Sequence, residues 1–155
     1  MGNIFNEDFQ DFIKAINQAE VEYLLVGGYS VILHGYARTT GDLDLWIKPT
    51  EANFKKLTVA FGIFGMPMFD LSLDKFLNTK DFDVFTFGRP PISIELLTVV
   101  KGLEFDHSYK ESKIFEQEGF GVRSIQFHHL IEAKKAAGRS RDLNDIDQLS
   151  RKKDS

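Results

Sequence analysis

Two aspartates within a short apolar run constrain the fold of this chain more than any other feature. From residue 42 the sequence reads Asp-Leu-Asp-Leu-Trp-Ile, so Leu43, Leu45 and Ile47 fall at alternate positions. Because successive side chains of a β-strand point to opposite faces, these apolar residues enter a core while Asp42 and Asp44 project from the other face. The pattern therefore predicts a half-buried strand with two carboxylates about 6.6 Å apart along the chain.

These two aspartates allow two interpretations. At a solvent-facing strand edge they are hydrated and have no further role. In a cleft the two carboxylates repel each other, and a divalent cation between them removes that repulsion. Carboxylate oxygens are hard ligands that suit Mg²⁺ or Mn²⁺. Asp42 and Asp44 are therefore candidate metal ligands.

A third acid, Glu95, favours the metal interpretation. It is the one charged residue in the apolar run over 92–100, which is typical of a central strand buried on both faces. Burying an unpaired carboxylate costs several kcal/mol, so Glu95 requires a salt bridge from a Lys or Arg, or a metal ion. Since neighbouring strands lie about 4.8 Å apart, adjacent strands would bring Glu95 to Asp42 and Asp44. Such a cluster could hold one or two metal ions.

A glycine pair lies just upstream of the aspartates. Gly27 and Gly28 close the apolar run over 21–26, and Ser30 opens the next segment. A backbone without side chains can approach a phosphate closely, and free N–H groups at a helix start favour an anion. The Ser30 hydroxyl would add a donor. The alternative is an ordinary turn, as most Gly-Gly pairs are.

Composition excludes several classes of protein. The 155 residues are 43% hydrophobic and include 15 Phe, which predicts a single domain over residues 1–155 with one core. A net charge of −4 gives no overall electrostatic footprint for nucleic acid. The absence of cysteine excludes disulfides and thiolate metal sites. No apolar run approaches the ~20 residues of a membrane span, and the N-terminus does not resemble a signal peptide. We expect a soluble, cytoplasmic protein with no membrane association.

The order of the periodic segments predicts an α/β (α+β) fold. We expect helices over 6–19, 30–35, 50–61, 70–77, 127–137 and 141–149, strands over 21–26, 43–47, 84–87 and 92–100, a turn at 88–91, a helix or loop over 105–109, and a short extended pair near Ile114 and Val122. Asn6 and Thr50 are expected helix caps.

These motifs together resemble the DNA polymerase beta-like nucleotidyltransferase superfamily, whose signature is Gly-Gly/Ser, about ten residues, then Asp-hydrophobic-Asp. More particularly, the chain resembles the small bacterial branch that includes abortive-infection nucleotidyltransferase toxins and minimal nucleotidyltransferases. The similarity covers most of the chain and is weakest over 61–87. It is carried by GGYS (27–30), GDLDLWI (41–47), SIELL (93–97), the longer string over 24–47, and LIEAKKAAGRSRDLNDIDQL (130–149).

The resemblance implies a mixed β-sheet flanked by helices, with a helical C-terminal tail. It also implies that Asp42 and Asp44 bind two catalytic metal ions and that Glu95 binds the ion that activates the acceptor hydroxyl. Two ions about 3.5–4 Å apart stabilise the attacking and leaving oxygens during in-line attack on an α-phosphate. Glu95 departs from the family pattern if the usual third acid is Asp. The extra methylene moves the carboxylate, and a displacement of about 1 Å can cost about 100-fold in rate.

The resemblance further implies that Gly27, Gly28 and Ser30 hold nucleotide phosphates. Arg38, which leads into the Asp42 strand, either contacts a phosphate or base or pairs with a surface acid. Lys134 belongs to a basic strip in the C-terminal tail. On a solvated helix it has no special role, but its stem could cover the core while its ammonium reaches a triphosphate. His34 is expected to pack rather than react.

Two functions follow from this sequence. The first is a metal-dependent nucleotidyltransferase that moves a nucleoside monophosphate from an NTP to a hydroxyl of a protein, RNA or small-molecule acceptor. By analogy it acts in a toxin–antitoxin or phage-defence system, with a toxin or antitoxin protein as partner or tRNA as acceptor. The alternative is a catalytically weak or inactive module of the same fold that binds nucleotide or regulates a partner. A purely structural protein with solvated acids is a third interpretation.

Overall fold

The computed structural model describes residues 3–89 and 92–154, the side chain of residue 154 excepted. In chain order its elements are α1 (Glu7–Gln18), β1 (Tyr23–Val26), α2 (Gly27–Leu33), β2 (Leu43–Ile47), α3 (Glu51–Phe64), α4 (Leu73–Leu77), β3 (Val84–Arg89), β4 (Ile92–Leu97), α5 (Phe105–Lys110), β5 (Lys113–Gln117), β6 (Phe120–Ser124), α6 (Phe127–Ala137) and α7 (Ser140–Asp154).

The strands form one mixed sheet in the order β3-β4-β2-β1-β6-β5. β1 and β2 are antiparallel, while β2 pairs with β4 and β1 pairs with β6 in parallel. Antiparallel pairing of β3 with β4 and of β5 with β6 completes the two edges. The predicted α+β class, with a mixed sheet flanked by helices and a helical C-terminal segment, is confirmed.

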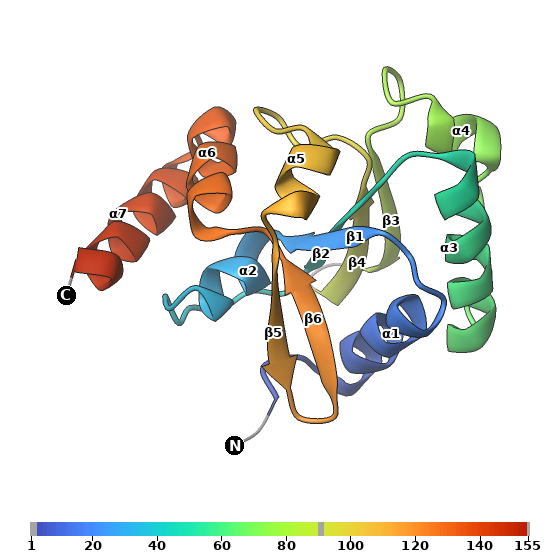
Figure 1. Cartoon of the computed structure of the whole chain (residues 1–155), viewed down its shortest axis with the longest axis horizontal. Coiled ribbons are helices and arrows are strands. Elements are labelled where there is room, and N and C mark those ends of the chain that lie inside the picture. Colours follow the sequence, from blue (N-terminus) through green and yellow to red (C-terminus); the bar gives the residue numbers. More distant parts are fainter. Residues whose placement is uncertain (1–2, 90–91, 155) are drawn as a thin grey trace.

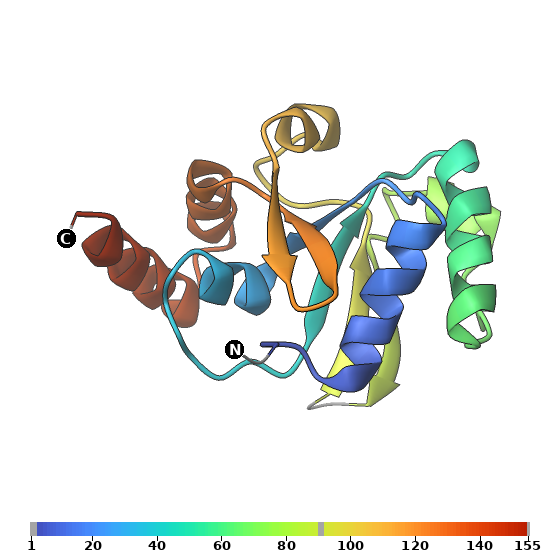
Figure 2. The same cartoon turned by 60° about the horizontal axis from the view of Figure 1, so that its bottom comes forward.

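Helices cover the sheet on both sides. Figures 1 and 2 show α1 and α3 packed together on one side, with α5, α6 and α7 on the other. The alternation predicted for β2 is confirmed, because Leu43, Leu45 and Ile47 belong to the core beneath α1 and α3. Trp46 points to the opposite side and packs in a second apolar cluster with Phe105 of α5. Period-two patterning thus places the aspartates on the α5–α6–α7 side.

Some boundaries differ from the sequence-based predictions. α2 begins at Gly27 rather than after the glycine pair, so the glycines form its first turn. β4 is an inner strand, as predicted, but it ends at Leu97 and is not buried on both faces. On the face that carries Glu95, both Glu95 and Leu97 are half-buried. The turn predicted at 88–91 overlaps the end of β3, and residues 90–91 lie outside the described residues.

Helix caps follow the sequence closely. The Asn6 side chain accepts a hydrogen bond from the Phe9 N–H, and Thr50 accepts one from the Asn53 N–H, as predicted. In the described parts of the chain, no helix combines the length and apolarity needed to cross a membrane.

Candidate active-site cleft

A cleft opens on the α6–α7 side of the sheet, where β2 and β4 approach the start of α2. It consists of two joined hollows with volumes of about 390 Å³ and about 230 Å³. The residues that line both are Gly27, Asp42, Asp44, Lys134, Arg139 and Arg141. The larger hollow adds Glu95 and an apolar wall, and the smaller adds Gly28, Arg38 and the loop over 39–41. One side of the cleft is therefore acidic and the other basic.

The three predicted carboxylates lie together on the acidic side. β2 and β4 pair in a register that places Asp44 beside Glu95, and Asp42 lies two residues before Asp44 on the same side. The Ser93 hydroxyl donates a 2.7 Å hydrogen bond to Asp42 and lies 3.4 Å from a Glu95 oxygen. Thr86 donates a 3.0 Å hydrogen bond to the other Glu95 oxygen. Hydroxyl groups of β3 and β4 therefore hold this cluster.

Glu95 has no Lys or Arg partner among the residues that the structure describes. The interpretation that Glu95 forms a salt bridge is therefore wrong for the described part of the chain. Its two oxygens accept hydrogen bonds from the hydroxyls of Thr86 and Ser93 instead.

The pKa of Asp44 is strongly perturbed. Burial raises its pKa from 3.8 to about 7, with further increases from the charges of Asp42 and Glu95 that outweigh the opposing effects of Lys134 and Arg141. A buried carboxylate beside two others cannot ionise fully near neutral pH without additional positive charge. Such perturbation is typical of functional sites.

The glycine pair has a steric role that the sequence did not reveal. A Cβ built on Gly27 would overlap the Asp44 carboxylate, and a Cβ built on Gly28 would overlap the Thr40 hydroxyl. Gly27 also has a φ of 70°, a conformation that side chains disfavour. The glycines therefore let α2 start directly against the side chains of β2 and its preceding loop.

Two candidate residues lie outside the cleft. Ser30 is fully buried, and its hydroxyl forms a 2.7 Å hydrogen bond with the Ser124 hydroxyl of β6. The prediction that this hydroxyl faces a phosphate is wrong, because Ser30 occupies the side of α2 that packs on the sheet. His34 packs as expected, with Nε2 2.8 Å from the Ile125 carbonyl oxygen and its ring against Phe115.

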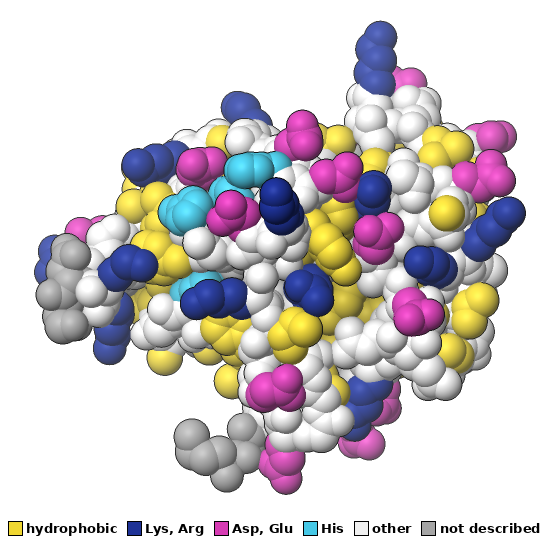
Figure 3. Space-filling view, in the orientation of Figure 1, with side chains coloured by type: hydrophobic (Ala, Val, Ile, Leu, Met, Phe, Trp, Pro, Cys, Tyr) yellow, Lys and Arg dark blue, Asp and Glu magenta, His cyan; other side chains and the backbone are white. Residues whose placement is uncertain are grey.

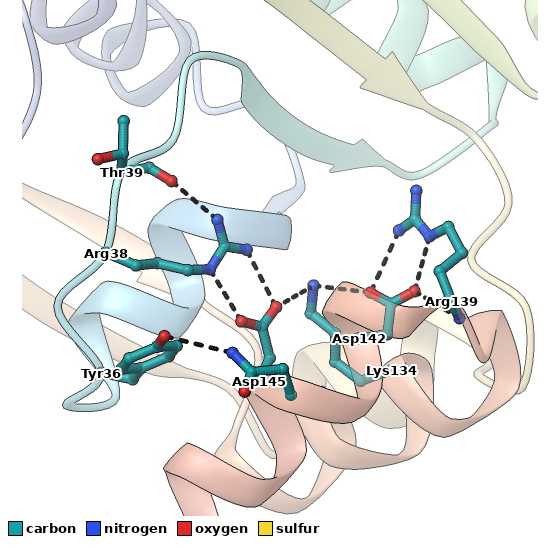
Figure 4. Close-up of polar contacts among 8 residues, drawn as sticks. Tyr36, Arg38, Thr39, Lys134, Arg139, Asp142 and Asp145 are labelled. Atoms are coloured by element: carbon teal, nitrogen blue, oxygen red, sulfur yellow. Dashed lines mark hydrogen bonds and ion pairs between the residues drawn. The ribbon is translucent and has the colours of Figure 1, made fainter.

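The basic side is built on an ion-pair network between α6, α7 and the loop before β2. Figure 4 shows the Lys134 ammonium between Asp142 and Asp145, 3.1 Å from an oxygen of each. Arg38 binds Asp145 through two hydrogen bonds of 2.9 and 3.0 Å. Arg139 reaches Asp142 at 2.6 Å. Lys134 is therefore buried at the cleft wall rather than solvated, and Arg38 pairs with an acid while lining the smaller hollow.

Asp142 and Asp145 anchor this network from inside the protein. Both are at most 1% exposed. Burial alone would raise the pKa of Asp142, but hydrogen bonds from Arg139 and Lys134 outweigh it and lower the pKa to about 2. In the sequence both acids follow a basic strip, and neither was predicted to be a site residue. The available signal was their three-residue spacing, which places them on one helix face together with Leu149.

Arg141 differs from Lys134 and Arg139, the other cations that line both hollows. It is exposed, lines both hollows, and forms no ion pair among the described residues. Its charge nevertheless acts on Asp44, whose pKa it lowers slightly against the effect of burial. Sequence reasoning did not select Arg141 as a site residue, because one arginine in a basic strip looks like any other.

As they stand, the three carboxylates do not form a metal-binding site. Among the residues that the structure describes, no three His, Asp or Glu side chains are arranged to hold a metal ion as they stand. The donor chemistry still suits Mg²⁺ or Mn²⁺, because all three acids offer hard oxygens and the charges of Lys134 and Arg141 do not outweigh the effects that raise the pKa of Asp44. Binding would require the carboxylates to exchange hydroxyl contacts for the cation.

Comparisons with known proteins do not assign the chain to a family. Neither the search against protein-family models nor the search of curated protein sequences gave a match.

Proposed function

We propose that this protein is a metal-dependent nucleotidyltransferase that transfers a nucleoside monophosphate from an NTP to a hydroxyl group. The observation that carries the proposal is the convergence of Asp42, Asp44 and Glu95 on one cleft opposite a basic wall. β2, the residue just before it and the adjacent parallel strand β4 supply the acids, and burial, together with the charges of Asp42 and Glu95, raises the pKa of Asp44. An arrangement of this kind suits a ligand that carries both a divalent cation and phosphates.

Asp42, Asp44 and Glu95 are the residues that would hold Mg²⁺ or Mn²⁺. Bound there, the cation would stabilise charge on the attacking and leaving oxygens of phosphoryl transfer. Gly27 supports the fit, because its missing side chain leaves space for the Asp44 carboxylate at the cleft. Ser93 and Thr86 orient the other two acids through hydroxyl contacts that carboxylates can exchange.

The two hollows suit the two ends of a nucleotide. The smaller hollow is polar and is lined by Gly28, Arg38 and Arg141 among others, which favours a triphosphate. The apolar wall of the larger hollow, which includes Leu97, Val100 and Leu130, favours the flat face of a base. Among the cations that line the smaller hollow, Arg141 is best placed to contact phosphate, since Arg38, Lys134 and Arg139 are engaged by Asp142 and Asp145.

A second candidate is a nucleotide-binding or regulatory module of the same fold with weak or no turnover. The observation that favours it is that these acids, as the described residues stand, do not form a group that could hold a metal ion. The longer side chain of Glu95 acts in the same direction. The acceptor is proposed as a protein, RNA or small molecule, and the setting as a cytoplasmic toxin–antitoxin or phage-defence system with a protein partner or tRNA. These rest on the sequence resemblance.

A thermal-shift titration tests the proposal. Wild type, Asp44→Ala and the exposed control Asp11→Ala are heated with Mg²⁺ or Mn²⁺, with and without each of the four NTPs. A nucleotide present at about 100 times its Kd should add roughly 2.7 kcal/mol to the stability of wild type and the control. The metal-dependent part of the shift should disappear in Asp44→Ala. No shift with any nucleotide, or an equal shift in Asp44→Ala, would contradict the proposal.

A further inference from the structure

A separate hollow of about 490 Å³ lies where the end of α2 meets β5, the start of α6 and the end of α7. We call it the basic groove; its key lining residues are His34, Lys113, Phe115, Phe127, His128 and Lys153. It shares no lining residue with either hollow of the cleft. On the face shown in Figure 3, hydrophobic side chains near the start of α6 and the end of α7 are bordered by Lys or Arg and by His.

The basic groove is cationic although the whole chain carries a net charge of −4. Among the described side chains, no Asp or Glu lines it. Lys113 and Lys153 form no ion pair with any carboxylate that the structure describes. Burial lowers the pKa of His34, and the charges of Lys113 and Lys153 lower it further against a hydrogen bond with the Ile125 carbonyl. The groove therefore has a local positive field that no described Asp or Glu of its lining neutralises.

Two aromatic rings also line the basic groove beside its lysines. Phe115 and Phe127 are only partly buried, and both rings contact His34 edge-on, with centroids 5.2 and 5.9 Å away. The Lys153 ammonium lies 4.4 Å from the Phe127 ring centroid. A cationic groove lined by partly exposed aromatic rings is the usual construction of a surface that binds single-stranded nucleic acid, with phosphates on the cations and bases on the rings.

We propose that the basic groove binds single-stranded nucleic acid, with Lys113 and Lys153 contacting phosphates and Phe115 and Phe127 stacking on bases. The rings line a hollow rather than a protruding face, which favours an inserted base over a duplex or a lipid surface. The proposal goes beyond nucleotidyl transfer, because this binding needs neither metal nor NTP. α2 joins the two sites, since its first residues line the cleft and its end lines the groove, about 10 Å away along the helix.

Fluorescence anisotropy with labelled 12-nucleotide oligo(U) and oligo(dT), in EDTA and at low salt, tests this proposal. The variant Lys113→Glu/Lys153→Glu should bind at least tenfold more weakly than wild type. The matched control Lys56→Glu/Lys80→Glu, which changes two exposed lysines elsewhere, carries the same net charge and should bind within twofold of wild type. The slope of log affinity against log salt should become shallower by about 1.4 in the groove variant. Tighter binding of oligo(U) or of oligo(dT) identifies the preferred ligand as RNA or as DNA, and either result supports the proposal.

Further variants separate stacking from charge and the groove from the cleft. Phe115→Leu should weaken binding by about tenfold without changing the salt slope, because stacking carries no counterion release. Asp44→Asn should bind the oligonucleotides as tightly as wild type does. Binding at the basic groove is therefore tested independently of nucleotidyl transfer. Circular dichroism confirms that each variant is folded. Equal losses in the groove and control variants, no binding by wild type, or binding only to phosphatidylserine vesicles would overturn the proposal.

Discussion

Gly27 and the Asp44 carboxylate lie so close that a single added methyl group at residue 27 would overlap the carboxylate. The first turn of α2 therefore packs directly against the acidic strand β2. The absence of a side chain at Gly27 makes room for the Asp44 carboxylate, whether or not a ligand is bound. This contact links the stability of the fold to the geometry of the cleft.

Gly27→Ala should consequently displace Asp44 and strain a backbone at positive φ. We expect a loss of about 2 kcal/mol or more in the free energy of unfolding, together with the loss of metal-dependent stabilisation by NTP. Urea denaturation and the thermal-shift titration measure the two effects. The matched control is Gly62→Ala on α3, where a Cβ meets nothing within 4 Å. It should stabilise the protein by up to about 1 kcal/mol. Similar effects at both positions would contradict the steric role of Gly27.

The raised pKa of Asp44 predicts an unusual pH dependence of the metal-free protein. Because the pKa rises from 3.8 to about 7 on folding, the folded chain binds more protons than the unfolded chain between those values. The Asp44 contribution to stability therefore falls as pH rises from about 4 to 7, by at most about 4 kcal/mol.

Asp44→Asn isolates this contribution. In EDTA at pH 8 the variant should be more stable than wild type, and the advantage should shrink as the pH is lowered to 5. Chemical denaturation of both proteins across this range measures the difference, which cancels the titration of other groups. A variant that is less stable than wild type at pH 8 would contradict the unfavourable burial of the Asp44 charge.

Lys134 and Lys135 are adjacent in the sequence but differ in environment. Lys134→Ala removes one of the cations that neutralise two buried aspartates. We expect the free energy of unfolding to fall by about 3 kcal/mol, the lower end of the range for removing one partner of a buried ion pair. Arg38 and Arg139 still neutralise part of the charge. Lys135→Ala, at an exposed position, should change stability by no more than about 0.5 kcal/mol. Equal effects would show that the network does not stabilise the α6–α7 pair.

Arg141→Ala tests the assignment of the exposed arginine to phosphate. The variant should keep the stability of wild type without ligand, because Arg141 forms no ion pair among the described residues, yet it should bind NTP about tenfold more weakly. Isothermal titration calorimetry with Mg²⁺ and NTP measures the affinity. The control is Lys56→Ala on α3, which should leave affinity unchanged. If Arg141→Ala bound NTP as tightly as wild type, the assignment of the triphosphate to the smaller hollow would be contradicted.

Local patterns predicted the sheet and its acids well. The alternation over residues 42–47 depends only on strand geometry, so it correctly placed the apolar residues in the core and the aspartates opposite. Glu95 was found because one charge in an apolar strand is costly and conspicuous. These features are properties of a single segment, and that is why the sequence reveals them.

Features that depend on packing between segments were harder to predict. The side of α2 that carries Ser30 is set by how the helix docks on β6, which no local pattern encodes. The burial of Asp142 and Asp145 was not predicted, because only the packing of α7 on α6 brings them against Lys134. The glycine pair was correctly singled out, but its steric reason became visible only when β2 lay beside it.

The most direct test of the central claim is a crystal structure with Mn²⁺ and an NTP analogue whose α,β-bridging oxygen is replaced by methylene. Anomalous scattering locates Mn²⁺ independently of the nucleotide. We predict a manganese peak coordinated by Asp42 and Asp44, with the triphosphate beside Arg141 in the smaller hollow. Manganese and nucleotide bound away from these carboxylates, or no manganese peak at saturating concentration, would contradict the proposed function.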